Sequence, residues 1–130
     1  MEEDRLKAVC YYVDDRGNSP VKEFIKSLQV KERAKVLAYI NELKKQGNNL
    51  RRPMADYLED GIYELRPKDT RVFYFFYLKD SAVLLHATKK KTQEIPRNDL
   101  SLCLKRKNLI ETGYGHMEKL EARGDLNEES

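Results

Sequence analysis

Apolar and polar residues between positions 61 and 91 follow a pattern that predicts three consecutive strands. At 62–66 they alternate between two faces, as in a half-buried strand. Residues 71–77 are rich in aromatic and β-branched side chains, and residues 82–88 are mostly apolar, which is typical of strands covered on both faces. The short polar turns between the three segments imply an antiparallel meander.

The remaining pattern predicts a fourth strand and three helices. Apolar residues at 6–13 indicate a strand, and a serine followed by proline begins a short helix at 20–27. Apolar residues at three- and four-residue steps predict a helix at 30–46, and a proline opens a last helix at 96–110. We expect residues 48–60 to be an irregular connector, in which the pair Arg51-Arg52 either touches phosphate or, as we favour, belongs to a solvated loop.

The predicted order β-α-α-β-β-β-α is typical of an α+β domain. We expect residues 1–110 to form one domain, with an antiparallel meander sheet packed against a helical hairpin and a C-terminal helix. Residues 111–130 are acidic and contain three glycines, so we expect a mobile extension with a brief helix at 116–123.

Composition narrows the class of protein. The 130 residues contain no apolar run of about 18 or more, so we expect no membrane span, and the acidic start lacks the apolar segment of a secretory signal. Cys10 and Cys103 lie in apolar sequence and form no Cys-x-x-Cys motif, so we expect buried, reduced thiols in a cytoplasmic protein. Two cysteines and two histidines provide no metal-binding cluster, so we expect no metal and no cofactor.

Positive charge is concentrated in one part of the chain. Residues 61–110 contain 11 Lys or Arg against 5 Asp or Glu, a net charge of +6, whereas the whole chain carries +3. This asymmetry indicates an anionic partner, most simply a nucleic acid. The alternative is an ordinary solvated surface.

Strand parity selects the candidate site residues. Glu64 and Arg66 share one face of their strand, and His86 and Lys90 share one face of theirs. Arg71 heads the central strand after a turn, so we expect its guanidinium to be half-exposed and to reach out of the sheet. If the faces coincide, all five side chains converge. The further candidates for phosphate binding are Lys89, Lys91 and Arg97.

Each candidate also has a structural interpretation. His86 is either a proton-transfer group or a histidine packed in its strand. Glu64 is either a general base or the ion-pair partner that orients Arg66, and the partner role is favoured because neighbouring arginines lower a carboxyl pKa. Arg66 either binds phosphate or caps its turn. The lysines at 89–91 either bind phosphate or form a solvated strand end, and aromatic residues at 63 and 74–76 either stack on bases or belong to the core.

Four segments carry a resemblance to a known family: SPVKEFIKSL, GIYELR, RVFYFFY and VLLHATKKKTQEIPRNDL. Residues 6–110 resemble the RelE/ParE superfamily of bacterial toxins, and most of all its HigB-like, phage-derived branch. The resemblance implies a RelE-like fold and the toxin of a type II toxin–antitoxin pair. Many members cut mRNA on the ribosome without a metal, whereas ParE-like members inhibit DNA gyrase. The implied partners are a helix-turn-helix antitoxin, mRNA and the ribosome, with no membrane, and with DNA only through the antitoxin complex.

The resemblance implies which residues of this sequence correspond to the basic site residues of the family. Arg71 matches the arginine that contacts the scissile phosphate, Lys90 matches a basic residue at the end of the next strand, and Arg66 matches a basic position after GIYEL. Two features depart from the best-known nucleases. Ile95-Pro96-Arg97 replaces the neighbourhood of a proton-transfer tyrosine, and Ile62 and Glu64 replace lysines. A gyrase-binding toxin and a non-toxic RNA-binding module therefore remain as alternatives to the mRNA endonuclease.

Overall fold

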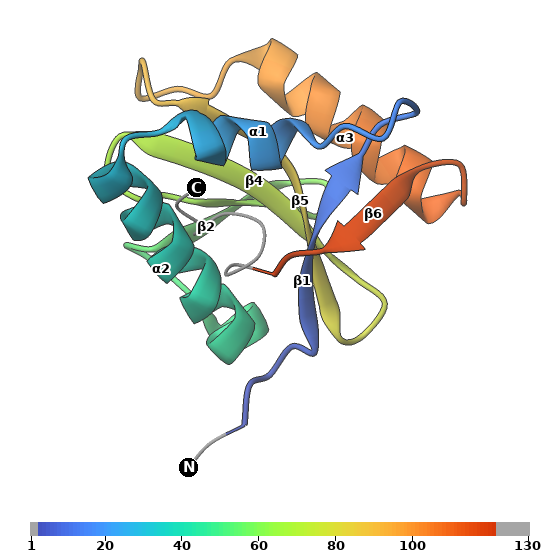
Figure 1. The fold of residues 1–130 in the computed structure, drawn as a ribbon, viewed down its shortest axis with the longest axis horizontal. Helices are drawn as coiled ribbons and strands as arrows, with labels where there is room; N and C mark the ends of the chain where they lie inside the picture. The colour runs from blue at the N-terminus through green and yellow to red at the C-terminus, as the bar shows by residue number, and fades with distance from the viewer. Residues whose placement is uncertain (1–2, 122–130) are drawn as a thin grey trace.

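The computed structural model describes residues 3–121, which form a mixed α+β fold with six strands in one sheet and three α-helices (Figure 1). No helix within that range is long and apolar enough to cross a membrane. The elements in chain order are β1 (Ala8–Val13), α1 (Pro20–Ser27), α2 (Val30–Gln46), a 3-10 turn η1 (Gly47–Asn49), β2 (Ala55–Glu59), β3 (Ile62–Leu65), β4 (Thr70–Tyr77), β5 (Ser81–Lys89), α3 (Arg97–Glu111) and β6 (His116–Lys119).

The helices form where the apolar spacing and the capping residues predict them. Ser19 caps α1, since its Oγ accepts a hydrogen bond from the Lys22 N–H at 3.3 Å, and Pro20 occupies the first turn. The apolar residues spaced along α2 lie on its buried side, including Val36 and Leu43. These predictions are confirmed.

The sheet has the strand order β2-β3-β4-β5-β1-β6. Strands β3 to β5 form the expected antiparallel meander, which β2 extends by one strand, but β1 pairs with β5 in parallel, with Ala8 opposite Ser81 and Tyr11 opposite Leu84. The predicted meander is confirmed for β3 to β5, whereas the parallel pairing of β1 departs from an antiparallel sheet. Short connections fix only strands that are neighbours in sequence, whereas the place of β1 depends on the long crossover through α1 and α2.

Strand β2 lies where we expected an irregular connector at 48–60, so that prediction is wrong. A two-residue turn, Asp60-Gly61, joins β2 to β3, and both residues have positive φ angles of 52° and 81°. Asp-Gly is a preferred sequence for the type I′ turn, whose twist matches that of a hairpin. The turn makes β2 an edge strand of the sheet.

Strand β6 lies where we expected a brief helix, so that prediction is also wrong for residues 116–119. It pairs antiparallel with β1, with Val13 opposite His116, and the Leu120 N–H donates to the Val9 carbonyl at 2.8 Å. This pairing covers an edge of β1 that would otherwise have unsatisfied backbone groups. Residues 122 and 123 of the expected helix lie outside the described residues, and the mobility of 111–130 stays a prediction.

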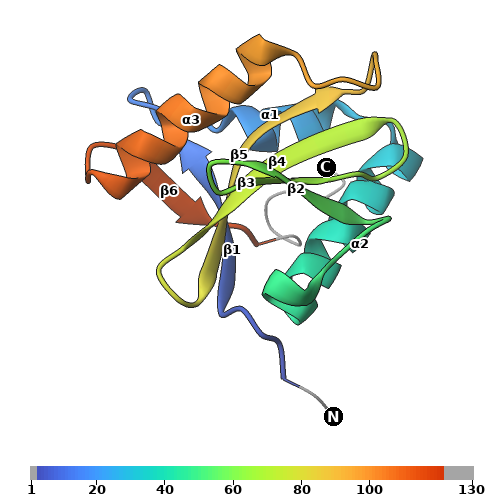
Figure 2. The same ribbon diagram turned by 180° about the vertical axis from the view of Figure 1, so that it is seen from behind.

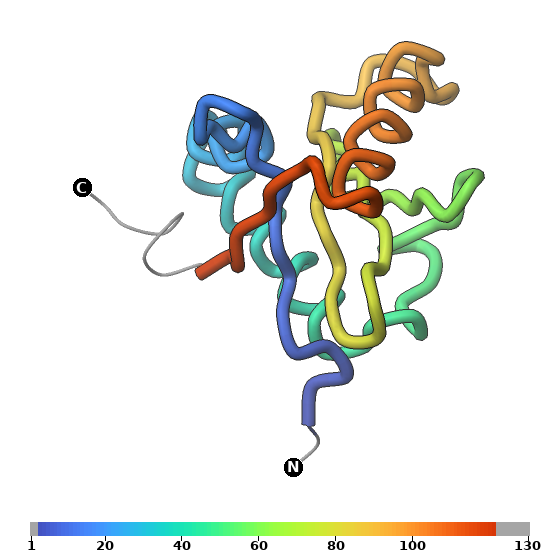
Figure 3. Tube along the Cα trace, turned by 90° about the vertical axis from the view of Figure 1, so that its right-hand side faces the viewer, coloured from blue at the N-terminus to red at the C-terminus, as the bar shows by residue number. Residues whose placement is uncertain are grey.

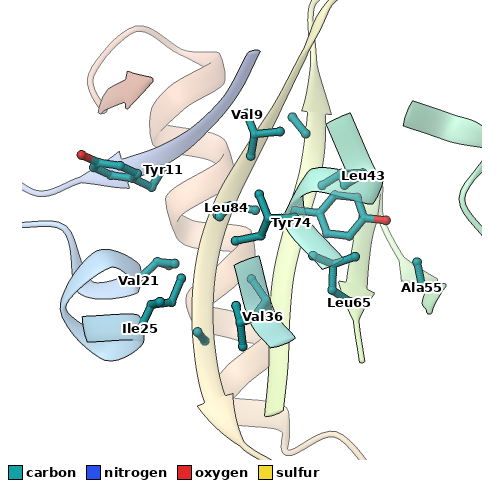
Figure 4. Packing of buried hydrophobic residues seen from close by; sticks show 14 of the residues in the cluster. Val9, Tyr11, Val21, Ile25, Val36, Leu43, Ala55, Leu65, Tyr74 and Leu84 are labelled. Atoms are coloured by element: carbon teal, nitrogen blue, oxygen red, sulfur yellow. The ribbon is translucent and has the colours of Figure 1, made fainter. Parts of the chain in front are cut away.

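Two apolar layers hold the helices on opposite faces of the sheet. Helix α1 crosses in front of the sheet in Figure 1 and lies behind it in Figure 2, and the view in Figure 3 places α1 and α3 on different sides. Helices α1 and α2 pack on one face, where Tyr74 lies beside Leu43 and Leu65 (Figure 4). On the other face Cys103 of α3 belongs to the cluster around Phe75. The sheet is therefore a rigid platform between two layers.

Candidate functional site

The ends of β3 and β5 and the start of β4 meet at one end of the sheet and enclose a pocket of about 320 Å³. We call it the cationic pocket, because five of its seven lining residues are lysine or arginine. The lining residues are Arg52, Pro53, Arg66, Lys68, Thr70, Arg71 and Lys90. Guanidinium and ammonium groups at this density are suited to hold a phosphate.

Backbone hydrogen bonds fix the positions from which these cations project. Arg66 follows β3, and its N–H donates to the Met54 carbonyl at 2.9 Å. Lys90 follows β5, and its N–H donates to the Asp69 carbonyl at 2.7 Å. Lys68 lies in the turn between β3 and β4 with a φ of 52°. The cations therefore stand on backbone that the sheet holds in place, as a preorganised binding site requires.

Glu64 lies beneath the arginines of the cationic pocket and is only 2% exposed. Its Oε1 is 3.3 Å from Arg71 Nη1, and its Oε2 is 3.7 Å from Arg66 Nε. Burial raises the pKa of the Glu64 carboxyl, and the two guanidinium groups oppose that rise without cancelling it. The expectation of a lowered pKa is therefore wrong. Both carboxylate oxygens face arginines, which is the geometry of an orienting ion-pair partner.

Arg71 is buried, with 4% of its surface exposed, so the expectation of a half-exposed, outward-reaching guanidinium is wrong. Its Nη2 donates to the carbonyl oxygens of Thr92 and Gln93 at 2.6 and 3.0 Å, and its Nη1 donates to Glu64. The segment from β5 to α3 covers the start of β4 and takes up these hydrogen bonds. Arg71 thus both lines the pocket and ties β4 to the segment that leads into α3.

Asp56 of β2 holds two further cations of the pocket. Its Oδ2 lies 2.8 Å from Arg52 Nη2 and 3.9 Å from Arg66 Nη1. The hydrogen bond from Arg52 is the main cause that lowers the pKa of the Asp56 carboxyl. Asp56 therefore stays ionised at neutral pH and keeps both guanidinium groups at the pocket.

The candidate site residues did not include two of the cations: Lys68, which was not considered, and Arg52, for which a solvated loop was favoured over phosphate contact. Arg52 belongs to the Arg-Arg pair that we interpreted as part of a loop, and Lys68 lies in a turn. The Asp60-Gly61 turn is the signal that could have placed Arg52, because a β2–β3 hairpin brings residues 52–56 back to the end of β3.

His86 is not among the described residues that line the cationic pocket. It shares the sheet face of Glu64, since Glu64, Phe73 and His86 are opposite one another on three adjacent strands, but Phe73 stands between them. The His86 ring stacks on Phe73 at 5.6 Å, and its Nε2 lies 2.9 Å from Oδ1 of Asp99 in the first turn of α3. An imidazole with one nitrogen on a carboxylate has a fixed orientation. Asp99 was not among our candidates.

The three remaining candidates lie outside the lining of the cationic pocket. Lys89 Nζ is 3.0 Å from Glu32 of α2, and Arg97 Nη1 is 3.2 Å from Glu59 of β2. Lys91 is exposed at the end of β5. A role of these residues in phosphate binding stays a prediction.

Comparison with known proteins identifies a family that this chain resembles. The model of a family described as phage-derived protein Gp49-like matches residues 23–108, which are 86 of the 130 residues. The matched region runs from α1 into α3 and includes every residue of the cationic pocket. No curated protein matches the chain.

Proposed function

The chain belongs to the phage-derived Gp49-like family, which is part of the RelE/ParE-like toxin superfamily, and from this premise we propose that it is the toxin of a type II toxin–antitoxin system that cleaves mRNA on the ribosome. The observation that supports the proposal best is the cationic pocket, in which Arg52, Arg66, Lys68, Arg71 and Lys90 surround one space. Five cations around a space of this size match one phosphodiester group and its neighbours.

The proposed reaction is attack of the ribose 2′-oxygen on the adjacent phosphorus. The bond from phosphorus to the 5′-oxygen breaks, so that one product carries a cyclic 2′,3′-phosphate and the other a free 5′-hydroxyl. A base removes the proton of the 2′-OH, and an acid supplies a proton to the leaving oxygen. Negative charge grows on the phosphoryl oxygens in the transition state, and preorganised cations stabilise it there.

The pocket supplies the charge stabilisation in this proposal. Arg66 and Lys90 project from strand ends and contact the phosphate, and Arg71 adds a fixed positive charge at its base. Glu64 acts as a positioning residue, because both of its oxygens face guanidinium groups. The half-buried Arg66 side chain retains donors for a bidentate contact, which a lysine would not provide.

His86, oriented by Asp99, lies outside the lining of the cationic pocket, so it can serve one of the two proton transfers only if the RNA extends from the pocket past Phe73 to the imidazole, and we propose this path. His86→Gln is expected to lower the cleavage rate by about 10²-fold, because general acid–base groups typically contribute that much. Asp99→Asn tests the orienting role, since it keeps a polar partner for the imidazole but removes the charge. Wild-type cleavage by both folded variants would assign His86 to packing against Phe73 alone.

The proposal includes a cytoplasmic antitoxin, a small helix-turn-helix protein that covers the cationic pocket. An uncovered pocket of this charge would attract RNA without selection, so a partner that occludes it would keep the toxin inactive. Co-expression with a neighbouring reading frame is expected to give a stable complex and to restore growth.

The test is induction of the chain alone, followed by mapping of mRNA 5′ ends in the cells. We expect growth arrest and new ends inside translated codons, with few in untranslated regions. A DNA-damage response without mRNA breaks would replace the proposal by gyrase inhibition. Normal growth of cells that accumulate the free, folded chain would refute both toxin hypotheses and would favour a non-toxic RNA-binding module.

A further inference from the structure

A row of tyrosine rings leads from the core to the surface across β4, β3 and β2. Tyr74 of β4 is buried, and its ring stacks on Tyr63 of β3 with centroids 5.4 Å apart and an interplanar angle of 17°. Tyr63 meets Tyr57 of β2 edge to face at 5.0 Å and 74°. Tyr57 is 53% exposed, so the row ends on a ring that is open to solvent.

The Tyr57 ring is held in place although it is exposed. Its hydroxyl oxygen accepts a hydrogen bond from the Gly61 N–H at 3.1 Å, across the β2–β3 turn. One edge of the ring rests against Tyr63. A ring fixed at both ends loses little conformational entropy when a ligand stacks on it.

Tyr57 and Tyr63 line a second pocket, of about 570 Å³, on the face of β2 and β3 that is opposite to Glu64. Its lining residues are Asn48, Leu50, Arg51, Arg52, Ala55, Asp56, Tyr57 and Tyr63. Arg52 lines both this pocket and the cationic pocket. The two pockets are therefore neighbours around the open edge of β2, joined by an arginine.

We propose that Tyr57 stacks against an unpaired nucleobase of the same RNA strand whose phosphate lies in the cationic pocket, with Arg52 contacting the backbone between the two. The inference rests on the proposed function and adds a base-binding site to it. An aromatic face beside a track of cations is how proteins hold single-stranded nucleic acid, because each base offers a π-face and each linkage a charge. Arg51 and Arg52 favour RNA over an apolar protein segment as the occupant.

The experiment uses the full chain and a fluorescent 2′-O-methyl oligoribonucleotide, which has no free 2′-OH and is not cleaved. Tyr57→Ala is expected to weaken binding by roughly 5- to 150-fold, the range that stacked aromatic residues contribute in alanine substitutions. Tyr57→Phe keeps the ring and is expected to bind within about 2-fold of the wild type. The matched control is Tyr114→Ala, which removes a tyrosine that is 77% exposed outside both pockets.

A second measurement reports stacking directly. The oligoribonucleotide carries 2-aminopurine at one position at a time, and stacking on Tyr57 is expected to quench its fluorescence at one or two positions in the wild type and in Tyr57→Phe. Replacing the base at that position by an abasic unit is expected to weaken RNA binding by the wild type. The same replacement is expected to leave RNA binding by Tyr57→Ala unchanged, because that variant has no ring on which the base could stack.

The outcomes separate this inference from the proposed function. If Arg66→Ala weakens RNA binding but Tyr57→Ala binds like the wild type, the base-binding site is refuted and the cationic pocket stands. If the wild type does not bind the oligoribonucleotide, either free or placed in the decoding site of purified ribosomes, the base-binding site is refuted, and the proposed function is decided separately by the mapping of mRNA ends in cells. Loss of antitoxin binding by Tyr57→Ala, with RNA binding unchanged, would assign this face to the protein partner and overturn the inference.

Discussion

Arg71 and Glu64 form an ion pair inside the protein, with 3.3 Å between Nη1 and Oε1 and at most 4% of either side chain exposed. The pair joins β4 to β3, and the remaining donors of Arg71 reach the carbonyl groups of Thr92 and Gln93. One arginine therefore serves the pocket and the fold at the same time. Loss of toxicity on its substitution would not by itself identify a catalytic role.

Arg71→Ala is expected to destabilise the protein by about 3–5 kcal/mol, because it leaves the Glu64 carboxylate buried without its nearest cation. The two carbonyl groups also lose their donors. Urea unfolding measures the change. The double variant Arg71→Met, Glu64→Gln is expected to recover part of the loss, since no buried charge is left unpaired. Equal stability of the wild type and Arg71→Ala would show that the pair contributes nothing to the fold.

Arg66→Ala is expected to lower mRNA cleavage by about 10²–10³-fold, as the loss of one preorganised transition-state contact does. Its side chain is 33% exposed and its ion pairs are 3.7 Å or longer, so the stability cost should stay near 0.5–1 kcal/mol. Cleavage of a reporter mRNA on purified ribosomes and thermal melting are measured together. Lys79→Ala, in the exposed turn after β4, is the control for loss of a surface charge. A folded Arg66→Ala protein with the wild-type rate would remove this residue from the mechanism.

Lys89 and Lys90 are adjacent but are expected to differ in their contribution to RNA binding. Lys90 lines the cationic pocket, whereas Lys89 pairs with Glu32 of α2. Lys90→Ala should therefore reduce the slope of log affinity against log salt concentration by about 1, since one phosphate contact is lost. Lys89→Ala should leave the slope nearly unchanged. The measurement is RNA affinity at five or more salt concentrations, and identical slopes for the two variants would contradict the assignment of Lys90 to the pocket.

Burial in the α3 layer raises the pKa of the Cys103 thiol to about 12 from its ordinary value of 9.0. Below pH 9 the thiol is protonated in both states, so it does not change the free energy of unfolding. Above pH 9 the unfolded chain loses this proton and the folded chain does not, so the folded state loses about 1.4 kcal/mol per pH unit until about pH 12.

The pH effect of Cys103 is isolated by comparing two proteins. The difference in stability between the wild type and Cys103→Ala is expected to shrink by about 1.4 kcal/mol between pH 8 and pH 10, because the variant has no thiol to ionise. Urea midpoints at the two pH values measure it. Rapid reaction of Cys103 with a thiol reagent in the native protein at pH 8 would contradict the burial on which this prediction depends.

The sequence sufficed for the elements that local patterns define. Apolar spacing and the Ser19 cap give α1 and α2, alternation gives β3, and aromatic, β-branched and apolar composition gives β4 and β5. Parity also brings Glu64, Arg66 and Arg71 together correctly, because side chains at fixed strand positions can project to only two faces.

What the sequence did not reveal depends on contacts between distant segments. The burial of Arg71 results from the path of residues 92–93, which no local pattern specifies. The parallel pairing of β1 with β5 and the addition of β6 are likewise set by packing across the whole chain. Arg52 lies at the pocket because the β2–β3 hairpin brings it there, and we interpreted the β2 side of that hairpin as a loop. The Asp60-Gly61 turn of the hairpin was nevertheless visible in the sequence.

The position of β1 has a consequence for synthesis of the chain. β1 is the first strand to be translated, yet its two neighbours are β5, at residues 81–89, and β6, at residues 116–119. Contacts over such sequence separations form slowly, since a long loop must close before they stabilise anything. The sheet therefore stays incomplete until residues 116–119 have left the ribosome, and a nascent fragment that ends before β5 holds β1 without a partner strand.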